Sequence, residues 1–287
     1  MLPRFDARQD GRGAAIQVHA FTPFNLQKTC RYGEMLFNRY DKYVGRSLDL
    51  YGEYSEGEVA VFRQCISPDS AVVEVGANIG AHTVFLAKHV GPQGRVWAFE
   101  PQRIAFQTLC ANVALNHLTN VYCSMQAVGA QPGVLRVPQL VPTLENNFGG
   151  LALGGFDRGD EIELVTLDHM KLPGCEFLKI DAEGMEREVL TGAIDLIVRT
   201  QPILYVENDY DDRRDALIRF IDSLGYVMYW HKPAYFNPDN FAANPQNVFP
   251  EEASINMLCV PKRLPHQLTG FLPVEVPPAE QQTTSDQ

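Results

Sequence analysis

The sequence predicts an α/β fold built on a doubly wound, mostly parallel sheet. From residue 71 onward, short apolar runs alternate with segments whose apolar residues recur at helical spacing. A glycine-rich turn, Gly76 to Gly80, joins the first apolar run to the first of these helices. Such alternation is typical of parallel strands linked by helices. Ligands bind these sheets at the carboxyl ends of the strands, so we expect the site there.

The predicted elements follow in chain order. Ser55 is expected to begin a helix through a capping box with Glu58, which satisfies free backbone N–H groups at the start of the helix, and Pro68 follows that helix. Apolar runs then indicate strands at 71–75, 95–99, 121–128, 161–166, 177–180, 203–206, 227–229 and 256–260. Helical spacing indicates helices at 79–89, around 106–113, at 185–196, and at 217–224 ahead of Gly225. The stretch 132–160 has no clear pattern.

Three regions are expected along the chain. Residues 1–54 form an N-terminal arm and cap, residues 55–265 form the α/β domain, and residues 266–287, rich in Pro, Glu, Gln and Thr, form a disordered tail. The aromatic segment 30–54 fits two interpretations, a lid over the site or packing along an edge of the sheet. As a lid, it would bring Tyr51 and Glu53 to the bound ligand.

Composition restricts the class of partner. The chain has 287 residues, of which 45% are hydrophobic and 21% charged, which suits a globular protein with a sizeable core. Its 24 basic and 35 acidic residues give a net charge of −11, which repels phosphate backbones and anionic lipids. We therefore expect neither nucleic acid nor a membrane as partner, while the sequence does not indicate an oligomeric state.

Cysteine usage and the absence of targeting signals favour the cytoplasm. The six cysteines contain no CxxC pair and no zinc-like spacing, and most lie in apolar surroundings. The charged first residues provide no apolar core for a signal peptide. No run of ~20 apolar residues indicates a membrane span.

The glycine-rich turn favours one cofactor over another. Glycines let the backbone approach a ligand closely, and Thr83 lies in the first turn of the helix that follows. A dinucleotide site requires a second glycine where this chain has Asn78, whose side chain would crowd a pyrophosphate. Glu74 would repel phosphates and attract a cation. S-adenosyl-L-methionine carries an ammonium and a sulfonium and no phosphate, so it fits better than NAD.

Other strand ends supply further candidates for cofactor binding. Glu100 ends the second strand, 24 residues after Gly76, where a carboxylate can accept both ribose hydroxyls. Ala127 and Val128 are placed to form a wall for the adenine ring. The full set of expected cofactor-binding residues is Glu74, Gly76, Ala77, Asn78, Gly80, Thr83, Glu100, Pro101, Ala127, Val128 and Asp181.

The segment Lys179-Ile-Asp-Ala-Glu-Gly184 carries the candidate catalytic groups. Asp181 and Glu183 follow the fourth buried strand, where they can take a proton, orient a hydroxyl or hold a metal. They can equally be acids that complement a helix N-terminus. Glu207 could line the acceptor pocket or join Asp181 at a metal, although no metal is the default expectation. His82 and His231 are weaker candidates for the base.

Together these motifs resemble the FkbM-type S-adenosylmethionine-dependent methyltransferases. The residues that carry the resemblance are Glu74-Val-Gly-Ala-Asn-Ile-Gly80, Ala98-Phe-Glu-Pro101, Asn120-Val121, Leu167-Asp168, Lys179-Ile-Asp-Ala-Glu-Gly184, Asn237-Pro-Asp-Asn240 and Asn256-Met-Leu-Cys259. The resemblance implies a Rossmann-like class I methyltransferase fold, with seven strands and an antiparallel last hairpin. It also implies that Glu74, Gly76, Asn78 and Gly80 surround the methionine part of the cofactor, with Glu100 at the ribose and Asp181 near the sulfonium.

The function expected from this resemblance is O-methylation of a hydroxyl on a small metabolite, sugar, glycan or natural product. Two alternatives remain open at this point. An oxidoreductase of the NAD type would use the same fold, and it would be revealed by hydride transfer. A scaffold protein that keeps the cofactor pocket would bind the cofactor without turnover.

Overall fold

The central element of the structure, a computed structural model that describes residues 23–152, 155–264 and 270–278, is an eight-stranded sheet. The strand order is β13-β11-β12-β10-β9-β3-β4-β5. These strands are β3 (Ala71–Val75), β4 (Arg95–Phe99), β5 (Val121–Ser124), β9 (Phe177–Ile180), β10 (Ile203–Glu207), β11 (Tyr226–His231), β12 (Asn256–Pro261) and β13 (Leu272–Pro273). Neighbours from β5 to β10 pair in parallel, whereas β12 is antiparallel to both β10 and β11. The prediction of a doubly wound, mostly parallel sheet is confirmed.

The eighth strand differs from the expected seven. The two-residue strand β13 pairs with Tyr229 and Trp230 of β11. It lies within the segment 266–287 that was expected to be disordered; of that segment, the structure describes only residues 270–278. Without β13, β11 would present an open edge with free backbone groups, and a short added strand covers part of such an edge. Two residues carry no periodicity, so the sequence pattern could not indicate this strand.

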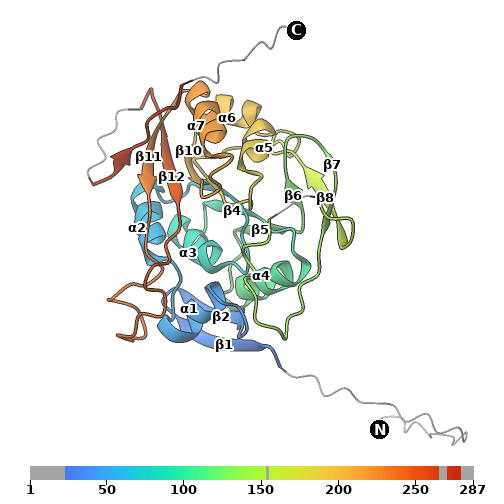
Figure 1. Cartoon of the computed structure of the whole chain (residues 1–287), viewed down its shortest axis with the longest axis vertical. Helices are drawn as coiled ribbons and strands as arrows, with labels where there is room; N and C mark the ends of the chain where they lie inside the picture. The colour runs from blue at the N-terminus through green and yellow to red at the C-terminus, as the bar shows by residue number, and fades with distance from the viewer. Residues whose placement is uncertain (1–22, 153–154, 265–269, 279–287) are drawn as a thin grey trace, which may run out of the picture.

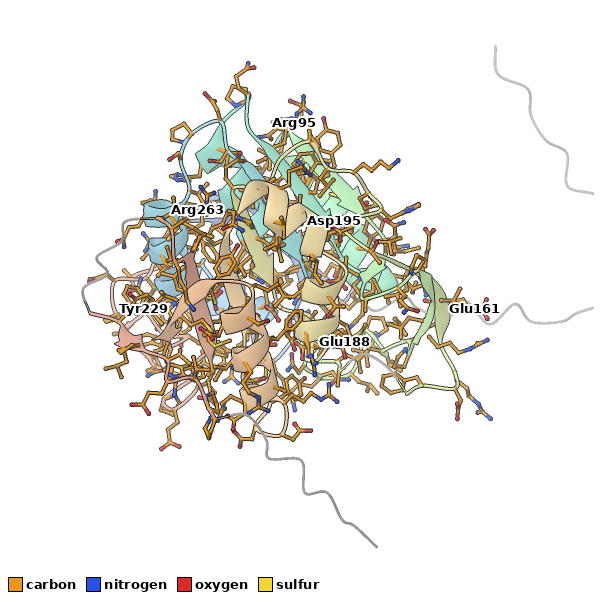
Figure 2. The ribbon with its side chains drawn as sticks, turned by 90° about the horizontal axis from the view of Figure 1, so that it is seen from above. Arg95, Glu161, Glu188, Asp195, Tyr229 and Arg263 are labelled. Carbon is orange, nitrogen blue, oxygen red and sulfur yellow. The ribbon has the colours of Figure 1, made fainter. Side chains whose placement is uncertain are left out.

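Helices cover both faces of the sheet. One face is covered by α2 (Glu56–Cys65), α3 (Ala81–Val90) and α4 (Arg103–Leu115), and the other by α5 (Glu186–Thr191), α6 (Ile194–Thr200) and α7 (Arg214–Ser223). Figure 1 shows α5 to α7 together at the top, and in Figure 2, seen from above, Glu188 and Asp195 mark α5 and α6 in front of the strands. Successive side chains of a strand point to opposite faces of the sheet. Val72 packs toward α2 and α3, and Val73 packs toward α5 to α7.

The segment 185–196, expected as one helix, forms two. Helix α5 ends at Thr191 and α6 begins at Ile194. At Gly192 the backbone runs so close to the carbonyl oxygen of Gly129 that a Cβ there would overlap it. The carbonyl of Gly192 also accepts a hydrogen bond from the Asp168 N–H. This tertiary contact breaks the helix, although the apolar spacing on either side is continuous.

A second, three-stranded sheet corrects two further expectations. It has the order β6-β8-β7 and contains β6 (Ala127–Val128), β7 (Gly133–Val137) and β8 (Asp160–Val165). Ala127 and Val128 therefore do not extend β5, which ends at Ser124, and the stretch without clear pattern contains β7. In β7 only Leu135, which is half-buried, and Val137, which is buried, turn away from solvent, so its sequence lacks a continuous apolar run.

The capping box at Ser55 is also not formed. Ser55 lies in the left-handed region with φ of 46°, and its hydroxyl donates to the Glu58 carboxylate at 3.0 Å instead of accepting a backbone N–H. Helix α2 still begins at Glu56, as predicted. Glu58 is buried and belongs to the site described below, which is why Ser55 serves that side chain rather than the helix end.

The N-terminal cap is a hairpin followed by a helix: β1 (Asn25–Cys30), β2 (Gly33–Asn38) and α1 (Val44–Tyr51). It lies beside residues 232–255, the long connection between β11 and β12, at the lower end of Figure 1. Glu53 joins these two segments, because it accepts hydrogen bonds from Arg31 at 2.6 Å, from the Asn237 side chain at 2.8 Å and from the Phe241 N–H at 2.8 Å. Across the described parts of the chain, no helix combines the length and apolar character needed to cross a membrane.

Asn112 of α4 fastens the cap to the domain, and its removal should destabilise the fold. Its fully buried side chain accepts from the Leu36 N–H at 2.6 Å and donates to the carbonyls of Leu36 at 2.9 Å and Ile79 at 2.7 Å. We expect Asn112→Ala to lower the free energy of unfolding in urea by about 2–4 kcal/mol. Gln107→Ala, at an exposed position of the same helix, should change it by less than ~0.5 kcal/mol. Equal losses in the two variants would contradict this role.

Candidate functional site

A cavity of about 340 Å³ lies at the carboxyl ends of the parallel strands. Its wall includes Gly76 after β3, Glu100 after β4, Asp181 after β9 and Glu207 at the end of β10. These strands are neighbours in the sheet, so their ends bring residues more than a hundred positions apart to one place. The cavity therefore lies where the alternation of strands and helices predicts the site.

The glycine turn forms the centre of this wall. Gly76 has φ of +79°, and a Cβ there would overlap the backbone carbonyl oxygen of Asp181. The N–H groups of Gly76 and Ala77 both donate to the carbonyl of Phe99 at 3.0 Å. The turn after β3 is thus held by backbone contacts with the ends of β4 and β9. Only glycine allows this approach at residue 76.

Glu100 and Asn78 present oxygen atoms at the same end of the cavity. The Glu100 carboxylate accepts from the Asn78 N–H at 2.8 Å and from the Gln102 N–H at 2.7 Å. Burial raises the pKa of Glu100 to about 7, against these two hydrogen bonds, which lower it. The Asn78 side-chain oxygen is buried and has no hydrogen-bond partner within the described structure. Both groups retain the capacity to accept hydrogen bonds from a ligand.

The loop at Asn147 closes this end of the cavity, which the sequence analysis did not predict. The Asn147 side-chain oxygen accepts from the N–H groups of Gly149 at 3.2 Å and Gly150 at 2.9 Å. Gln102 donates to the carbonyl of Phe148 at 2.9 Å, which fixes the loop to the start of α4. Asn147, Gly149 and Gly150 all line the cavity. The paired glycines after an asparagine were the available signal for a tight turn, but nothing in the pattern placed this turn against Asn78.

The predicted cofactor-binding residues fall into two groups. Lining the cavity are Gly76, Asn78, Glu100, Pro101, Ala127, Val128 and Asp181, while Glu74, Ala77, Gly80 and Thr83 are not among its lining residues. The Glu74 side chain is buried on the α3 side, where it accepts from the Thr83 hydroxyl at 2.6 Å. At Gly80, with φ of +84°, a Cβ would press on Leu109. The second group therefore packs around the glycine turn on the side away from the cavity.

A buried lysine lies under the cavity floor. Lys179 is 2% exposed and donates to Asp181 at 3.0 Å. It is also paired in register with Glu74 of β3, while Glu58 approaches from α2. Burial lowers the pKa of Lys179, but the charges of Asp181, Glu74 and Glu58 outweigh burial and raise it. Lys179 is therefore a structural cation rather than a proton donor.

Three carboxylates gather beside this lysine. One oxygen from each of Asp181, Glu183 and Glu207 lies within 4.8 Å of the others. Burial and the charge of Asp181 raise the pKa of Glu183 to about 8, although Tyr210 donates to it at 3.0 Å. Burial, with the charges of Asp181 and Glu183, raises the pKa of Glu207 well above its ordinary value. The structure brings together both predicted catalytic residues and Glu207, which the sequence indicated as a residue of the acceptor pocket or a partner of Asp181 at a metal.

Aromatic side chains line the end of the cavity beside the cap. Tyr43 from α1's start, Tyr54 and Tyr235 contribute to this wall, with the ring of Tyr235 centred 5.7 Å from each of the other two. The segment 30–54 therefore supplies residues to the site, as the lid interpretation requires. Tyr235, with Ser254 and Asn256, comes from the far end of the chain. No local pattern links residue 235 to residue 43, so sequence reasoning missed this wall.

Four other candidates do not line the cavity. His82 is buried between Tyr54 and Phe62, and burial lowers its pKa to about 3. His231 shares a hydrogen bond of 2.7 Å with the Tyr205 hydroxyl. Tyr51 donates to the carbonyl of Gln246 at 2.9 Å, and Glu53 binds the loop as described above. All four side chains contact neighbouring elements of the fold rather than the cavity.

The strand order and the position of the cavity define a class I methyltransferase fold. The family described as Methyltransferase FkbM domain matches residues 74–228, which is more than half of the chain. The chain therefore belongs to the FkbM methyltransferase family, and S-adenosyl-L-methionine is its cofactor.

Each relative aligns with only part of this chain, and this chain covers about half the length of the first two. Methyltransferase sdnD of Sordaria araneosa is 29% identical over 154 residues, which span 42% of this chain and 59% of that protein. A methyltransferase FkbM structure from Methylobacillus flagellatus is 22% identical, with a TM-score of 0.46 over 67% of this chain and 44% of that one. A putative rRNA methylase of Clostridium thermocellum is 15% identical, with a TM-score of 0.44 over 72% of this chain and 97% of that one.

Burial of His82 should make the fold sensitive to acid. Its folded pKa of about 3 lies below the ordinary 6.5, so its contribution to stability is present above pH 6.5 and is lost as the pH falls. Between pH 7.5 and 5, we expect wild type to lose about 2 kcal/mol of unfolding free energy relative to His82→Gln. Urea titrations at both values measure this difference.

His169→Gln, at an exposed histidine, is the matched control and should show no such pH dependence relative to wild type. If the difference between wild type and His82→Gln is the same at both pH values, the assignment of His82 as a neutral buried group is wrong.

Proposed function

We propose that the protein transfers a methyl group from S-adenosyl-L-methionine to a hydroxyl of a small metabolite, sugar or natural product. The observation that carries this proposal is one cavity whose lining combines two sets of groups. We take the glycine turn with Asn78 and Glu100 as the first, cofactor end, and the three tyrosines with the group of carboxylates as the second, acceptor end. A cofactor in the first end and an acceptor in the second would meet at Asp181.

The first end fits the cofactor in charge and in hydrogen bonding. Among the described residues that line the cavity, none is Lys or Arg, so nothing there is suited to the phosphates of a dinucleotide. The carboxylate of Glu100 suits two ribose hydroxyls, and the unpartnered oxygen of Asn78 suits an ammonium or hydroxyl donor. The acidic wall favours a ligand that carries positive charge.

S-adenosyl-L-methionine, when bound, supplies an electrophilic methyl group. The protein must then hold the acceptor oxygen in line with that group and exclude water. An alcohol at neutral pH also needs a group that takes its proton. Asp181 and Glu183 lie where they can orient the hydroxyl. With its pKa raised to about 8, Glu183 is mostly protonated at pH 7, and its ionised fraction, which grows as the pH rises, is a stronger proton acceptor than an ordinary glutamate.

The second end favours a neutral, hydroxylated acceptor. The rings of Tyr43, Tyr54 and Tyr235 offer flat apolar faces with hydroxyl groups at their edges. Ser254 and Asn256 add polar groups that can bind further hydroxyls. Sugar rings and polyhydroxylated natural products combine apolar faces and hydroxyl edges in this way.

Cofactor binding should depend on Glu100 and on pH. Ribose hydroxyls donate to the ionised carboxylate, so affinity for S-adenosylhomocysteine should fall as the pH drops below the Glu100 pKa of about 7. We expect binding roughly tenfold weaker at pH 5.5 than at pH 8. Glu100→Gln should weaken binding at pH 8 by about tenfold or more and remove most of the pH dependence. Titration calorimetry measures both effects.

Glu188→Gln, at an exposed position on α5, is the control and should bind like wild type (Figure 2). Affinity and pH dependence in Glu100→Gln that match wild type would contradict the placement of the ribose at Glu100.

Methyl transfer itself is tested with methyl-labelled S-adenosyl-L-methionine and a panel of sugars, phenols and hydroxylated natural products. Labelled product from a hydroxyl acceptor is the expected result. Hydride transfer to NAD with a simple alcohol would replace the proposal by an oxidoreductase. Cofactor binding with no labelled product across the panel would favour the scaffold alternative.

A further inference from the structure

Two adjacent strand ends direct three carboxylates to one point of the cavity. Asp181 and Glu183 follow β9, and Glu207 ends β10, its parallel neighbour. The three side chains each offer an oxygen within 4.8 Å of the other two, and all three line the cavity. Glu183 has φ of +52°, so the backbone after β9 adopts an uncommon conformation at this residue.

Of the three carboxylates, Glu207 is the one with a buried oxygen that the described residues leave without a hydrogen bond. Its Oε2 atom is shielded from solvent and has no hydrogen-bond partner among the described residues. The other two carboxylates each have one partner, Lys179 for Asp181 and the Tyr210 hydroxyl for Glu183. A buried carboxylate oxygen without a partner is unfavourable, and it identifies the position where a ligand would complete the structure.

Charge at this point favours a cation. Three carboxylates at this separation repel one another unless a cation or shared protons lie between them. The ammonium of Lys179 contacts Asp181, but Glu74 and Glu58 share its charge from the other side. A neutral hydrogen-bond donor would satisfy one Glu207 oxygen and leave the repulsion in place.

The spacing suits a hard divalent ion. Such ions bind carboxylate oxygens at ~2.0–2.1 Å for Mg²⁺ and ~2.3–2.6 Å for Ca²⁺, so oxygens on one ion lie up to ~4–5 Å apart. The observed 4.8 Å limit falls in this range. We propose that Asp181, Glu183 and Glu207 form a divalent-cation site with oxygen ligands, open toward the cavity.

The cation would act on the acceptor, and this part rests on the proposed methyltransferase function. Because the site opens to the cavity, an acceptor hydroxyl can complete the coordination. A bound cation lowers the pKa of a coordinated hydroxyl and fixes its position. The three carboxylates then serve as ligands, which explains why three acids gather where one general base would suffice. An acceptor with two neighbouring hydroxyls would bind best.

The test uses the full chain with MnCl₂, MgCl₂ and CaCl₂ as separate probes in titration calorimetry, without acceptor. We expect one equivalent of at least one ion to bind, with a dissociation constant below about 1 mM. Glu207→Gln and Asp181→Asn should each weaken binding at least tenfold. Glu188→Gln, the exposed control, should bind the ion like wild type. Because Glu207 lies among like charges, Glu207→Gln should melt at or above the wild-type temperature when no ion is present.

Two results would overturn the inference. One is that none of the three ions binds up to about 5 mM, which would mean that the carboxylates share protons instead. The other is that Glu207→Gln, folded by its melting curve, binds the ion as wild type does. S-adenosylhomocysteine binding is measured on the same samples. Intact cofactor binding without ion binding rejects the cation site and leaves the proposed function standing, whereas ion binding without cofactor binding rejects the proposed function and not the site.

Discussion

The ammonium group of Lys179, buried in the middle of the parallel sheet, is the charge on which the site depends. It contacts Asp181 at 3.0 Å and lies between Glu74 on the neighbouring strand and Glu58 on α2. A buried carboxylate without positive charge nearby would be strongly destabilising. Lys179 makes it possible to bury Glu74 and Glu58 behind the cavity. It also holds Asp181, which lines the cavity.

The second constraint is the close contact between the backbones at the ends of β3 and β9. Gly76 lies against the Asp181 carbonyl, where no side chain fits. The N–H groups of Gly76 and Ala77 donate to the carbonyl of Phe99 at the end of β4. The cavity is therefore framed by rigid strand ends, while the cap and the 232–255 connection form the opposite wall. Glu53 and Asn112 connect these two parts to each other and to the domain. Under the proposed function, the cap and the 232–255 connection would contact the acceptor, and the strand ends would carry the chemistry.

The local sequence pattern predicted a strand or helix correctly wherever residues close together in the chain determine that element. The runs at 71–75, 95–99 and 177–180 coincide with β3, β4 and β9, because the central strands of a sheet covered on both faces need mostly apolar residues. The pattern gave an incomplete or wrong prediction where a contact with a residue distant in the chain determines the local structure. Gly129 breaks the helix at Gly192, Glu58 takes the Ser55 hydroxyl away from the helix end, and β13 forms only because β11 offers an edge. In the site, Asp181 and Glu183 were predicted from one short segment, while Tyr235 and the Asn147 loop were not.

The sequence by itself determined the fold class, the glycine turn and the acids that follow the buried strands, because these depend on periodicity and on residues close together in the chain. Only the tertiary structure decided which of these residues reach the cavity. Glu74 and Asp181 illustrate the difference: both accompany strand ends, but Glu74 lies within its strand and points toward α3, whereas Asp181 follows its strand and faces the cavity. The meeting of Asp181 and Glu183 with Glu207, and of Tyr43 with Tyr235, follows from the order of strands in the sheet and the packing of the cap, which contacts between distant residues determine.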